Sequence, residues 1–351
     1  MYEKELPHAN FYGFLSALLS ISSAILLGFI DDSLDLRWRH KLFFPTLSTL
    51  PVLMLYHLSG SSTFVILPTA VRNLLAPYFP YPLPLTIDIH ALYYIYMGML
   101  IVFCTNAINI YAGINGLEVG QSIVVTASVL IFNVVQLFRM ETEAWNHSLS
   151  IYLLFPFLTT SIVLYSFNKY PARVFVGDTY CYWAGMSLAV AAILGHFSKT
   201  MLLFLVPQVF NFVYSLPQLF RFVPCPRHRL PKYNAETDKV GMSFAEFKES
   251  DLNLFGRLFI SLCSSIGLLF RENFEKDGEQ WTRVNNLTLI NLTLKWTRVN
   301  NLTLINLTLK FTGPLHEATL TRTLLIMQVF FSIVAFLIRF GLASLFYNVV
   351  H

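Results

Sequence analysis

Two adjacent aspartates, Asp31 and Asp32, follow a long apolar run and stand directly before a cluster of cations. The segment LGFIDDSLDLRWRHK also contains Arg37 and Lys41. Carboxylates can ligate a divalent cation, and arginine and lysine can hold phosphate oxygens. The same acidic pair is, however, equally typical of a helix end that faces water. The segment therefore predicts a phosphate site only if other segments supply complementary groups.

Three further segments supply such groups. NAINIYAGINGLEVGQS contains Asn109, RVFVGDTYCYWAGM contains Asp178, and PCPRHRLPKYN contains the cationic stretch 227–229. Magnesium favours a few protein oxygens together with substrate phosphates, and a glycine-bearing turn such as AGINGL lets a base or phosphate approach the backbone closely. The combined set predicts a site where a sugar nucleotide diphosphate reacts with a lipid phosphate.

Each of these segments also has a simpler explanation. Asn109 and Asn115 are of a type that commonly caps helices and forms turns, with Gly113 and Gly116 supplying positive φ. The cations at 227–229 could merely contact anionic lipid headgroups. A common site is favoured only if the segments share one side of a membrane.

The composition indicates that membrane setting. Hydrophobic residues make up 55% of the 351 residues, charged residues make up 13%, and the mean hydropathy is +0.57. These values exclude an ordinary soluble globular domain and predict an all-α polytopic membrane protein. Eight apolar runs are long enough, or nearly so, to cross a membrane as helices: 11–30, 42–58, 89–108, 119–138, 150–167, 180–196, 200–220 and 323–347.

Two apolar segments are weaker candidates for spanning helices. The run at 42–58 is short and contains Pro45 and Pro51. The segment 255–270 is shorter still and contains Arg257, so we expect it at the membrane interface or in a folded loop.

With eight spans, all four polar segments fall on the same side of the membrane. The loops on that side hold most of the cations, whereas the opposite loops hold only Arg72, Arg139 and Lys199. The positive-inside rule therefore predicts that this side is cytoplasmic. Acids and cations near a membrane are costly unless they line a cavity, which favours a common site. A transporter is disfavoured, because its polar residues would gather near the bilayer midplane.

The chain is expected to divide into three regions. Residues 1–220 form the first seven transmembrane helices with the cytoplasmic active-site loops, 221–322 form a small α/β cytoplasmic insertion, and 323–351 form the last transmembrane helix. No metal-ligand spacing joins the four cysteines, which we interpret as reduced thiols.

The insertion contains a perfect tandem repeat. WTRVNNLTLINLTLK occupies 281–295 and again 296–310. Its LTLINLTL core nearly alternates apolar and polar residues, which predicts a strand in each copy. Two copies are too few for a solenoid, so the repeat indicates a recent duplication or an error in the gene model. Its Asn-Leu-Thr triplets match the N-glycosylation pattern but would face the cytoplasm, and we interpret them as structural residues.

At these motifs the sequence resembles the polyprenyl-phosphate sugar-1-phosphate transferases. LGFIDDSLDLRWRHK, CTNAINIYAGINGLEVGQS, VFVGDTYCYWAGM and PCPRHRLPKYN are similar to segments of the eukaryotic UDP-N-acetylglucosamine–dolichyl-phosphate N-acetylglucosaminephosphotransferases. The resemblance extends over essentially the whole chain. The acidic pair and the asparagine-rich loop are shared with the bacterial members, whereas the RHR motif points to the eukaryotic branch. The family has about ten spans, so the resemblance implies that about two spans precede the segment that begins here.

The resemblance implies a reaction, a cofactor and a location. The reaction transfers GlcNAc-1-phosphate from UDP-GlcNAc to dolichyl phosphate, giving GlcNAc-diphosphate-dolichol and UMP, as the first step of the dolichol-linked oligosaccharide pathway for N-glycosylation. The implied cofactor is Mg²⁺. The implied location is the endoplasmic reticulum membrane, with the active site facing the cytosol.

The resemblance also implies site residues by position. The implied catalytic residues are Asp31, Asp32, Lys41, Asn109 and Asp178, of which Asn109 and Asp178 would be the magnesium ligands. The implied substrate-binding residues are Gly113, Asn115 and Phe175 for uridine, and Arg227, His228 and Arg229 for the diphosphate and the sugar. A phosphate monoester with a second pKa of about 6 is mostly dianionic at neutral pH. We therefore expect the acidic pair to position Lys41, magnesium or the acceptor, and not to act as a general base.

Two other functions stay open. The chain could be a related transferase that uses another UDP-sugar, or a catalytically inactive membrane subunit or scaffold of the same family. The expected partners are UDP-GlcNAc, dolichyl phosphate and membrane lipid. A homodimer stays open as well, and we expect no nucleic-acid partner.

Overall fold

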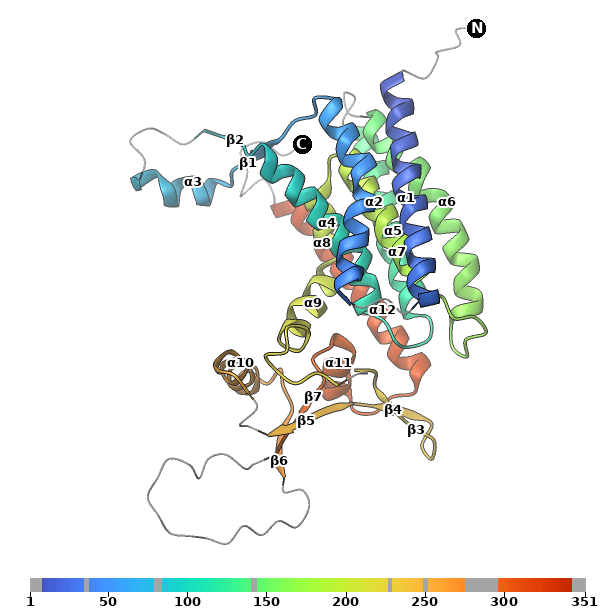
Figure 1. Ribbon diagram of the computed structural model, residues 1–351, viewed down its shortest axis with the longest axis vertical. Coiled ribbons are helices and arrows are strands. Elements are labelled where there is room, and N and C mark those ends of the chain that lie inside the picture. Colours follow the sequence, from blue (N-terminus) through green and yellow to red (C-terminus); the bar gives the residue numbers. More distant parts are fainter. Residues whose placement is uncertain are drawn as a thin grey trace. The chain divides into compact units, whose positions relative to one another are not determined.

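The computed structural model describes residues 8–34, 38–78, 84–139, 144–226, 229–248, 252–274 and 296–342 (Figure 1). The chain forms two compact units. The first unit comprises Met1–Ala112, Gly116–Val206 and Leu325–His351, and the second comprises Gly113–Asn115 and Pro207–Leu324. The longer segment of the second unit thus begins within the seventh predicted span, ahead of the insertion expected from residue 221.

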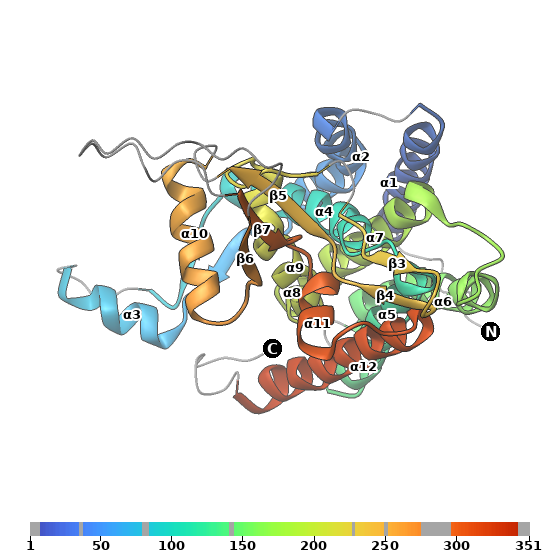
Figure 2. The ribbon, with the colours of Figure 1, turned by 90° about the horizontal axis from the view of Figure 1, so that it is seen from below.

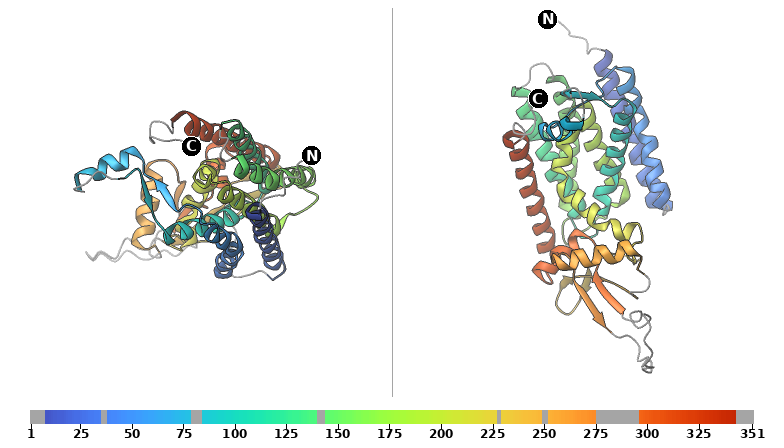
Figure 3. Two further views of the ribbon diagram at one scale, coloured as in Figure 1. Left: turned by 90° about the horizontal axis from the view of Figure 1, so that it is seen from above. Right: turned by 90° about the vertical axis from the view of Figure 1, so that its left-hand side faces the viewer.

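The first unit is a bundle of long helices, seen from two further directions in Figure 3. Its helices are α1 (His8–Leu34), α2 (Trp38–Leu58), α4 (Ala91–Ile110), α5 (Leu117–Arg139), α6 (Ala144–Asn168), α7 (Gly177–Leu194), α8 (Ser198–Phe204) and α12 (Glu317–Phe336) from Leu325 onward, followed by a π-helical segment (Leu337–Leu342). Between α2 and α4, an antiparallel pair β1 (Phe64–Ile66) and β2 (Thr86–Asp88) flanks the short helix α3 (Thr69–Leu75) and a 3₁₀ turn (Ala76–Tyr78).

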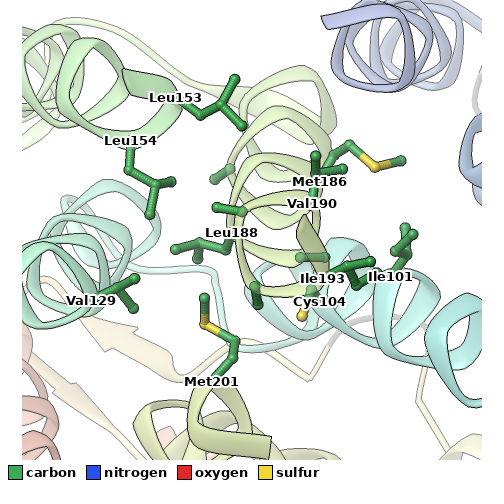
Figure 4. Close-up of a cluster of buried hydrophobic side chains, with 14 of the residues drawn as sticks. Ile101, Cys104, Val129, Leu153, Leu154, Met186, Leu188, Val190, Ile193 and Met201 are labelled. Atoms are coloured by element: carbon green, nitrogen blue, oxygen red, sulfur yellow. The ribbon is translucent and has the colours of Figure 1, made fainter. Parts of the chain in front are cut away.

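Helix α7 lies at the centre of this bundle and packs against α1, α4 and α6. Thirteen of its eighteen residues are buried, many of them small ones such as Ala189, Ala191 and Ala192. Figure 4 shows its larger side chains, including Met186 and Leu188, meeting side chains from the helices around it. Small residues let helices approach closely, which allows α7 to hold its neighbours in fixed positions.

Five of the described helices are long and apolar enough to cross a membrane, and these are α1, α4, α5, α6 and α12. The bent pair formed by α8 and α9 (Val206–Leu219) would make six if it is counted as one broken span. The polytopic helical class is therefore confirmed, whereas the number of eight spans stays a prediction. Helices α2 and α7 form where spans were predicted but are less apolar. For α7 the reason is its burial within the bundle, because a helix enclosed by protein needs no lipid-facing surface.

The second unit combines helices with two small antiparallel sheets (Figure 2). Besides α9 from Pro207 onward, it contains β3 (Lys232–Asn234), β4 (Lys239–Gly241), β5 (Phe244–Lys248), α10 (Leu254–Ser265), β6 (Arg271–Phe274), β7 (Trp296–Asn300), α11 (Leu304–Thr312) and α12 up to Leu324. Strand β7 is the central strand of the order β5-β7-β6, with Val299 opposite both Ala245 and Arg271. The mixed helix and strand content predicted for this region is therefore confirmed, whereas its bounds and its cytoplasmic side stay predictions. The apolar segment predicted at the interface forms α10.

The strand prediction for the repeat core is wrong for the second copy, and the first copy lies outside the described residues. WTRVN forms β7 as a strand, but LINLTLK begins the helix α11. Thr303 caps this helix, since its side chain accepts a hydrogen bond from the Asn306 backbone N–H at 3.3 Å. Leu304, Ile305 and Leu309 are all buried in this helix. Their burial outweighs the near-alternating pattern that predicted a strand.

Candidate active site

Helices α1, α4 and α7 bring predicted site residues together within the first unit. Two glycines make these contacts close. A Cβ on Gly28 of α1 would lie 2.6 Å from the Thr179 Cα atom of α7, and a Cβ on Gly185 of α7 would lie 2.4 Å from the Thr105 Cα atom of α4. Such separations are too short for any side chain, so both helix pairs depend on glycine.

Asp32 accepts hydrogen bonds from the N-terminal turn of α7. Its Oδ1 atom accepts from the Asp178 backbone N–H at 2.7 Å, and its Oδ2 atom accepts from the Thr179 backbone N–H at 2.9 Å and the Thr179 hydroxyl at 2.5 Å. The first N–H groups of a helix have no partner within the helix, and its N-terminus favours negative charge. A carboxylate on α1 thus fixes the turn of α7 that carries Asp178.

Asn109 and Asp178 meet directly across the contact between α4 and α7. The Asn109 Nδ2 atom donates to the Asp178 Oδ1 atom at 2.5 Å. Gly177 precedes Asp178 with φ of +65°, and a Cβ there would lie 2.5 Å from the Asp32 Oδ2 atom. Glycine at this position therefore lets the carboxylate of Asp32 reach the helix end beside Asp178.

Asp31 lies deeper than Asp32. Its side chain is only 2% exposed, and its Oδ2 atom accepts from the Tyr182 hydroxyl at 3.4 Å. The two adjacent aspartates therefore differ in surroundings. One contacts a tyrosine inside the bundle, whereas the other contacts the N-terminus of α7.

We expect Gly185→Ala to destabilise the bundle by about 1–3 kcal/mol, the usual cost of overpacking a close contact. The added methyl group would collide with the backbone of α4 at Cys104 and Thr105. Gly98→Ala is the matched control, because the nearest atom to its added Cβ is a Leu53 methyl carbon at 3.9 Å. Thermal unfolding of both variants in detergent measures the difference. Equal melting temperatures would contradict the close contact between α4 and α7.

The second unit holds another set of predicted site residues. Gly113 of this unit has φ of +110°, and Gly116, which belongs to the first unit, has φ of +82°, as their type predicts. A Cβ on Gly113 would lie 2.1 Å from a Leu230 methyl carbon, so the loop Gly113–Asn115 packs against the segment that carries Arg229. This unit therefore joins part of the predicted uridine site to the end of the RHR motif.

The start of α12 holds the backbone of that loop. The Asn115 backbone N–H donates to the Glu317 Oε1 atom at 2.7 Å, and the Thr321 hydroxyl donates to the Asn115 carbonyl oxygen at 2.9 Å. Both contacts use the Asn115 main chain and involve no atom of its side chain. The predicted role of Asn115 in binding a base is therefore compatible with its packing.

Arg229 is a partly buried cation. Its Nη1 atom is buried and has no hydrogen-bond partner in the part of the chain that the structure describes. Burial lowers the pKa of the Arg229 guanidinium, although arginine stays protonated at neutral pH. A desolvated cation with an unused donor favours an anionic ligand such as a phosphate.

The other predicted site residues are placed as follows. Phe175 belongs to the first unit and is 87% exposed. Lys41 lies in α2, while its side chain, together with Arg227 and His228, falls outside the described residues. The magnesium site and the uridine pocket stay predictions. Among the described residues no group of three or more His, Cys, Asp or Glu residues gathers, and the four cysteines form no disulfide with one another.

Sequence reasoning missed residues that hold the predicted site residues in place within each unit. Thr179 and Tyr182 contact the acidic pair, and Glu317 binds the loop at Asn115. Glu317 carries one local signal, as an acid in the first turn of a helix. The partners of Thr179 and Tyr182 lie 147 and 151 residues away in the sequence. No local pattern predicts contacts over such separations.

Comparison with known proteins places these residues in context. Residues 14–196 match the family model described as glycosyl transferase family 4. A UDP-N-acetylglucosamine–dolichyl-phosphate N-acetylglucosaminephosphotransferase of Saccharomyces cerevisiae is 41% identical over 344 residues, which cover 97% of this chain and 71% of the relative. The protein with the same description in Dictyostelium discoideum is 44% identical over 73% of this chain and 68% of its own length. A phospho-N-acetylmuramoyl-pentapeptide-transferase of Borrelia hermsii is 29% identical over 52% of this chain and 51% of its own.

Proposed function

The chain belongs to glycosyl transferase family 4, and from this premise we propose that it transfers GlcNAc-1-phosphate from UDP-GlcNAc to dolichyl phosphate. The observation that carries the proposal is the cluster in which Asp32 fixes the N-terminus of α7 and Asp178 meets Asn109. The residues of this cluster come from the motifs on which the resemblance to this family rests. The products are GlcNAc-diphosphate-dolichol and UMP.

We propose that Asn109 and Asp178 hold a Mg²⁺ ion. Their side chains lie within hydrogen-bond distance, and each carries an oxygen of the kind that magnesium prefers. Two protein ligands fit an ion that takes its other ligands from water and substrate phosphates. When bound, the ion would neutralise charge on the donor diphosphate.

The cationic residues suit the phosphates of the two substrates. Arg229 offers a partly buried guanidinium with an unused donor, which suits the donor diphosphate or the sugar attached to it. Arg227, His228 and Lys41 are proposed from the resemblance alone, the first two for the donor and Lys41 for the acceptor phosphate. Gly113, Asn115 and Phe175 are proposed for uridine on the same basis.

The reaction would proceed by in-line displacement. An oxygen of dolichyl phosphate forms a bond to the sugar-linked phosphorus of UDP-GlcNAc, the bond from that phosphorus to the bridging oxygen breaks, and UMP leaves with that oxygen. Because the acceptor phosphate is already mostly ionised, the step needs no base. Asp32 acts by holding the turn that carries Asp178, since both of its oxygens accept from α7.

We further propose that the protein resides in the endoplasmic reticulum membrane with the active site on the cytosolic side. The apolar helices support a membrane protein, and the eukaryotic relatives suggest this compartment. The distribution of Lys and Arg among the predicted loops supports the orientation.

A transfer assay tests the proposal. We expect the purified chain in detergent to make GlcNAc-diphosphate-dolichol from labelled UDP-GlcNAc, dolichyl phosphate and Mg²⁺, and to lose product when the ion is chelated. UDP-GalNAc and UDP-MurNAc-pentapeptide in parallel reactions identify the donor. Product from one of these donors and none from UDP-GlcNAc would favour the related transferase. Failure with all three donors, by a chain that is folded, would favour the inactive subunit.

A further inference from the structure

Asn306 is a fully buried asparagine in the third position of α11, and all of its hydrogen-bonding capacity is used. Its Nδ2 atom donates to the Arg229 carbonyl oxygen at 3.0 Å and to the Thr303 hydroxyl at 2.9 Å. Its Oδ1 atom accepts from the Ser243 backbone N–H at 2.8 Å and the Ser243 hydroxyl at 3.3 Å. One side chain therefore joins α11, the start of β5 and the segment that carries Arg229.

The Arg229 carbonyl is anchored mainly by this asparagine. Among the described residues, the other donor to this carbonyl is the Ser243 hydroxyl, at 3.3 Å, whose single proton is shared with the Asn306 Oδ1 atom. A helix held by several buried hydrogen bonds gives the anchor a fixed position. The Leu304 backbone N–H donates to the Asn211 Oδ1 atom at 2.7 Å, and the neighbouring Leu302 N–H donates to the Gln218 Oε1 atom at 2.8 Å.

We propose that Asn306 is a positioning residue for donor binding, which acts by fixing the main chain of Arg229 so that its guanidinium meets the diphosphate or sugar of the donor. The inference rests on the proposed function, because it assigns Arg229 to the donor. The Arg229 side chain is partly buried and keeps an unused donor at Nη1, so its direction depends on where its main chain is held. Displacement of a binding group by about 1 Å can cost orders of magnitude in rate.

The tandem repeat supplies a control that few proteins offer. Asn291 occupies in the first copy the place that Asn306 occupies in the second, and the two copies are identical over all fifteen residues from 281–295 and 296–310. Asn291→Ala therefore makes the same change in the same local sequence. A difference between the two variants reports the tertiary position of the second copy and not the local sequence.

We expect Asn306→Ala to raise the KM for UDP-GlcNAc about tenfold, with the KM for dolichyl phosphate within about twofold of wild type. Asn291→Ala is expected to leave both constants unchanged. Leu309→Ala is a stability control, since Leu309 is 1% exposed in the same helix. Loss of folded enzyme lowers the apparent kcat in proportion to the active fraction and leaves KM unchanged, whereas displacement of Arg229 changes KM.

Three results would overturn the inference. The first is an unchanged donor KM in Asn306→Ala with a fall in kcat that matches Leu309→Ala. The second is a near wild-type donor KM in both single variants with a rise only in the double variant, which would mean that either copy can serve. The third applies if Asn306→Ala does not fold, in which case Asn306→Asp keeps the size of the side chain and removes the amide donor to the Arg229 carbonyl, and an unchanged donor KM in that variant contradicts the anchor.

Direct titration of UDP-GlcNAc against the detergent-solubilised chain separates this inference from the proposed function. A wild-type chain that binds UDP-GlcNAc still tests Asn306 through the change in Kd, even without turnover. A wild-type chain that neither binds nor transfers overturns the proposed function, and the inference with it. A wild-type chain that transfers while Asn306→Ala binds the donor equally well overturns the inference alone.

Discussion

Asp178→Asn is expected to reduce transfer by about 100- to 1,000-fold, which is the effect of removing one group that stabilises transition-state charge. The substitution keeps the size of the side chain and removes its negative charge. Asp178 lies at the N-terminus of α7, and its Oδ1 atom is 2.5 Å from the Asn109 Nδ2 atom. The physical reason for the loss is that an amide pair holds a divalent cation much less tightly than an amide and a carboxylate.

The measurement is the rate of product formation across a magnesium titration. We expect the variant to need a higher magnesium concentration for half-maximal rate, and melting in detergent to change little. Asp238→Asn is the matched control, because Asp238 is an aspartate of the second unit whose side chain is 58% exposed. Retention of most activity at an unchanged magnesium requirement would rule out Asp178 as a ligand.

Asp32→Asn is the second variant with a large expected effect. We expect a loss of about 10- to 100-fold in rate together with about 1–2 kcal/mol of stability, as for a lost helix cap. An asparagine oxygen can still accept one N–H of α7, but its NH₂ group then faces the other. The Asp178 turn would lose part of its support, while the chemical step would need no new base.

The pH profile of the Asp32→Asn reaction separates positioning from base catalysis. A positioning role predicts a lower rate with a profile of unchanged shape and position, because the acceptor phosphate sets the ionisation that matters. Thr179→Val removes one of the three donors to Asp32 and is expected to have a smaller effect in the same direction. A large loss restricted to low pH would support a base role for Asp32, and full activity would contradict both roles.

Stability and activity should respond differently to these changes. Gly185 allows the close contact between α4 and α7, so its replacement is expected to lower the melting temperature. The transfer rate is then expected to fall only in proportion to the fraction of unfolded protein. Asp178→Asn acts on rate with little change in melting, and Asp32→Asn is expected to lower the rate by more than its loss of stability explains. A variant series that lowers rate and melting temperature in strict proportion would indicate that the cluster is only structural.

The sequence alone determined the class of this protein and the location of its chemistry along the chain. Apolar runs of the length of a bilayer indicate membrane helices, because the bilayer core selects for length and apolarity residue by residue. Asp31, Asp32, Asn109 and Asp178 stand out because the predicted spans place their segments on one side of the membrane, together with complementary cations. The positive φ of Gly113 also follows from local preferences.

Tertiary structure alone decided which of these residues meet and how. Asp32 can bind the N-terminus of α7 only because glycines stand at 28 and 177. These glycines belong to two helices that are far apart in the sequence. The repeat core LINLTLK becomes a helix in the second copy because burial and the Thr303 cap outweigh its near-alternating pattern. Local sequence patterns indicate which residues of a segment are exposed to water or lipid. Contacts between distant segments arise only when complete helices pack together. The same fifteen residues occur twice in this chain. The sequence of the repeat therefore does not predict the contact of Asn306 with Arg229, which arises from the packing of the second copy.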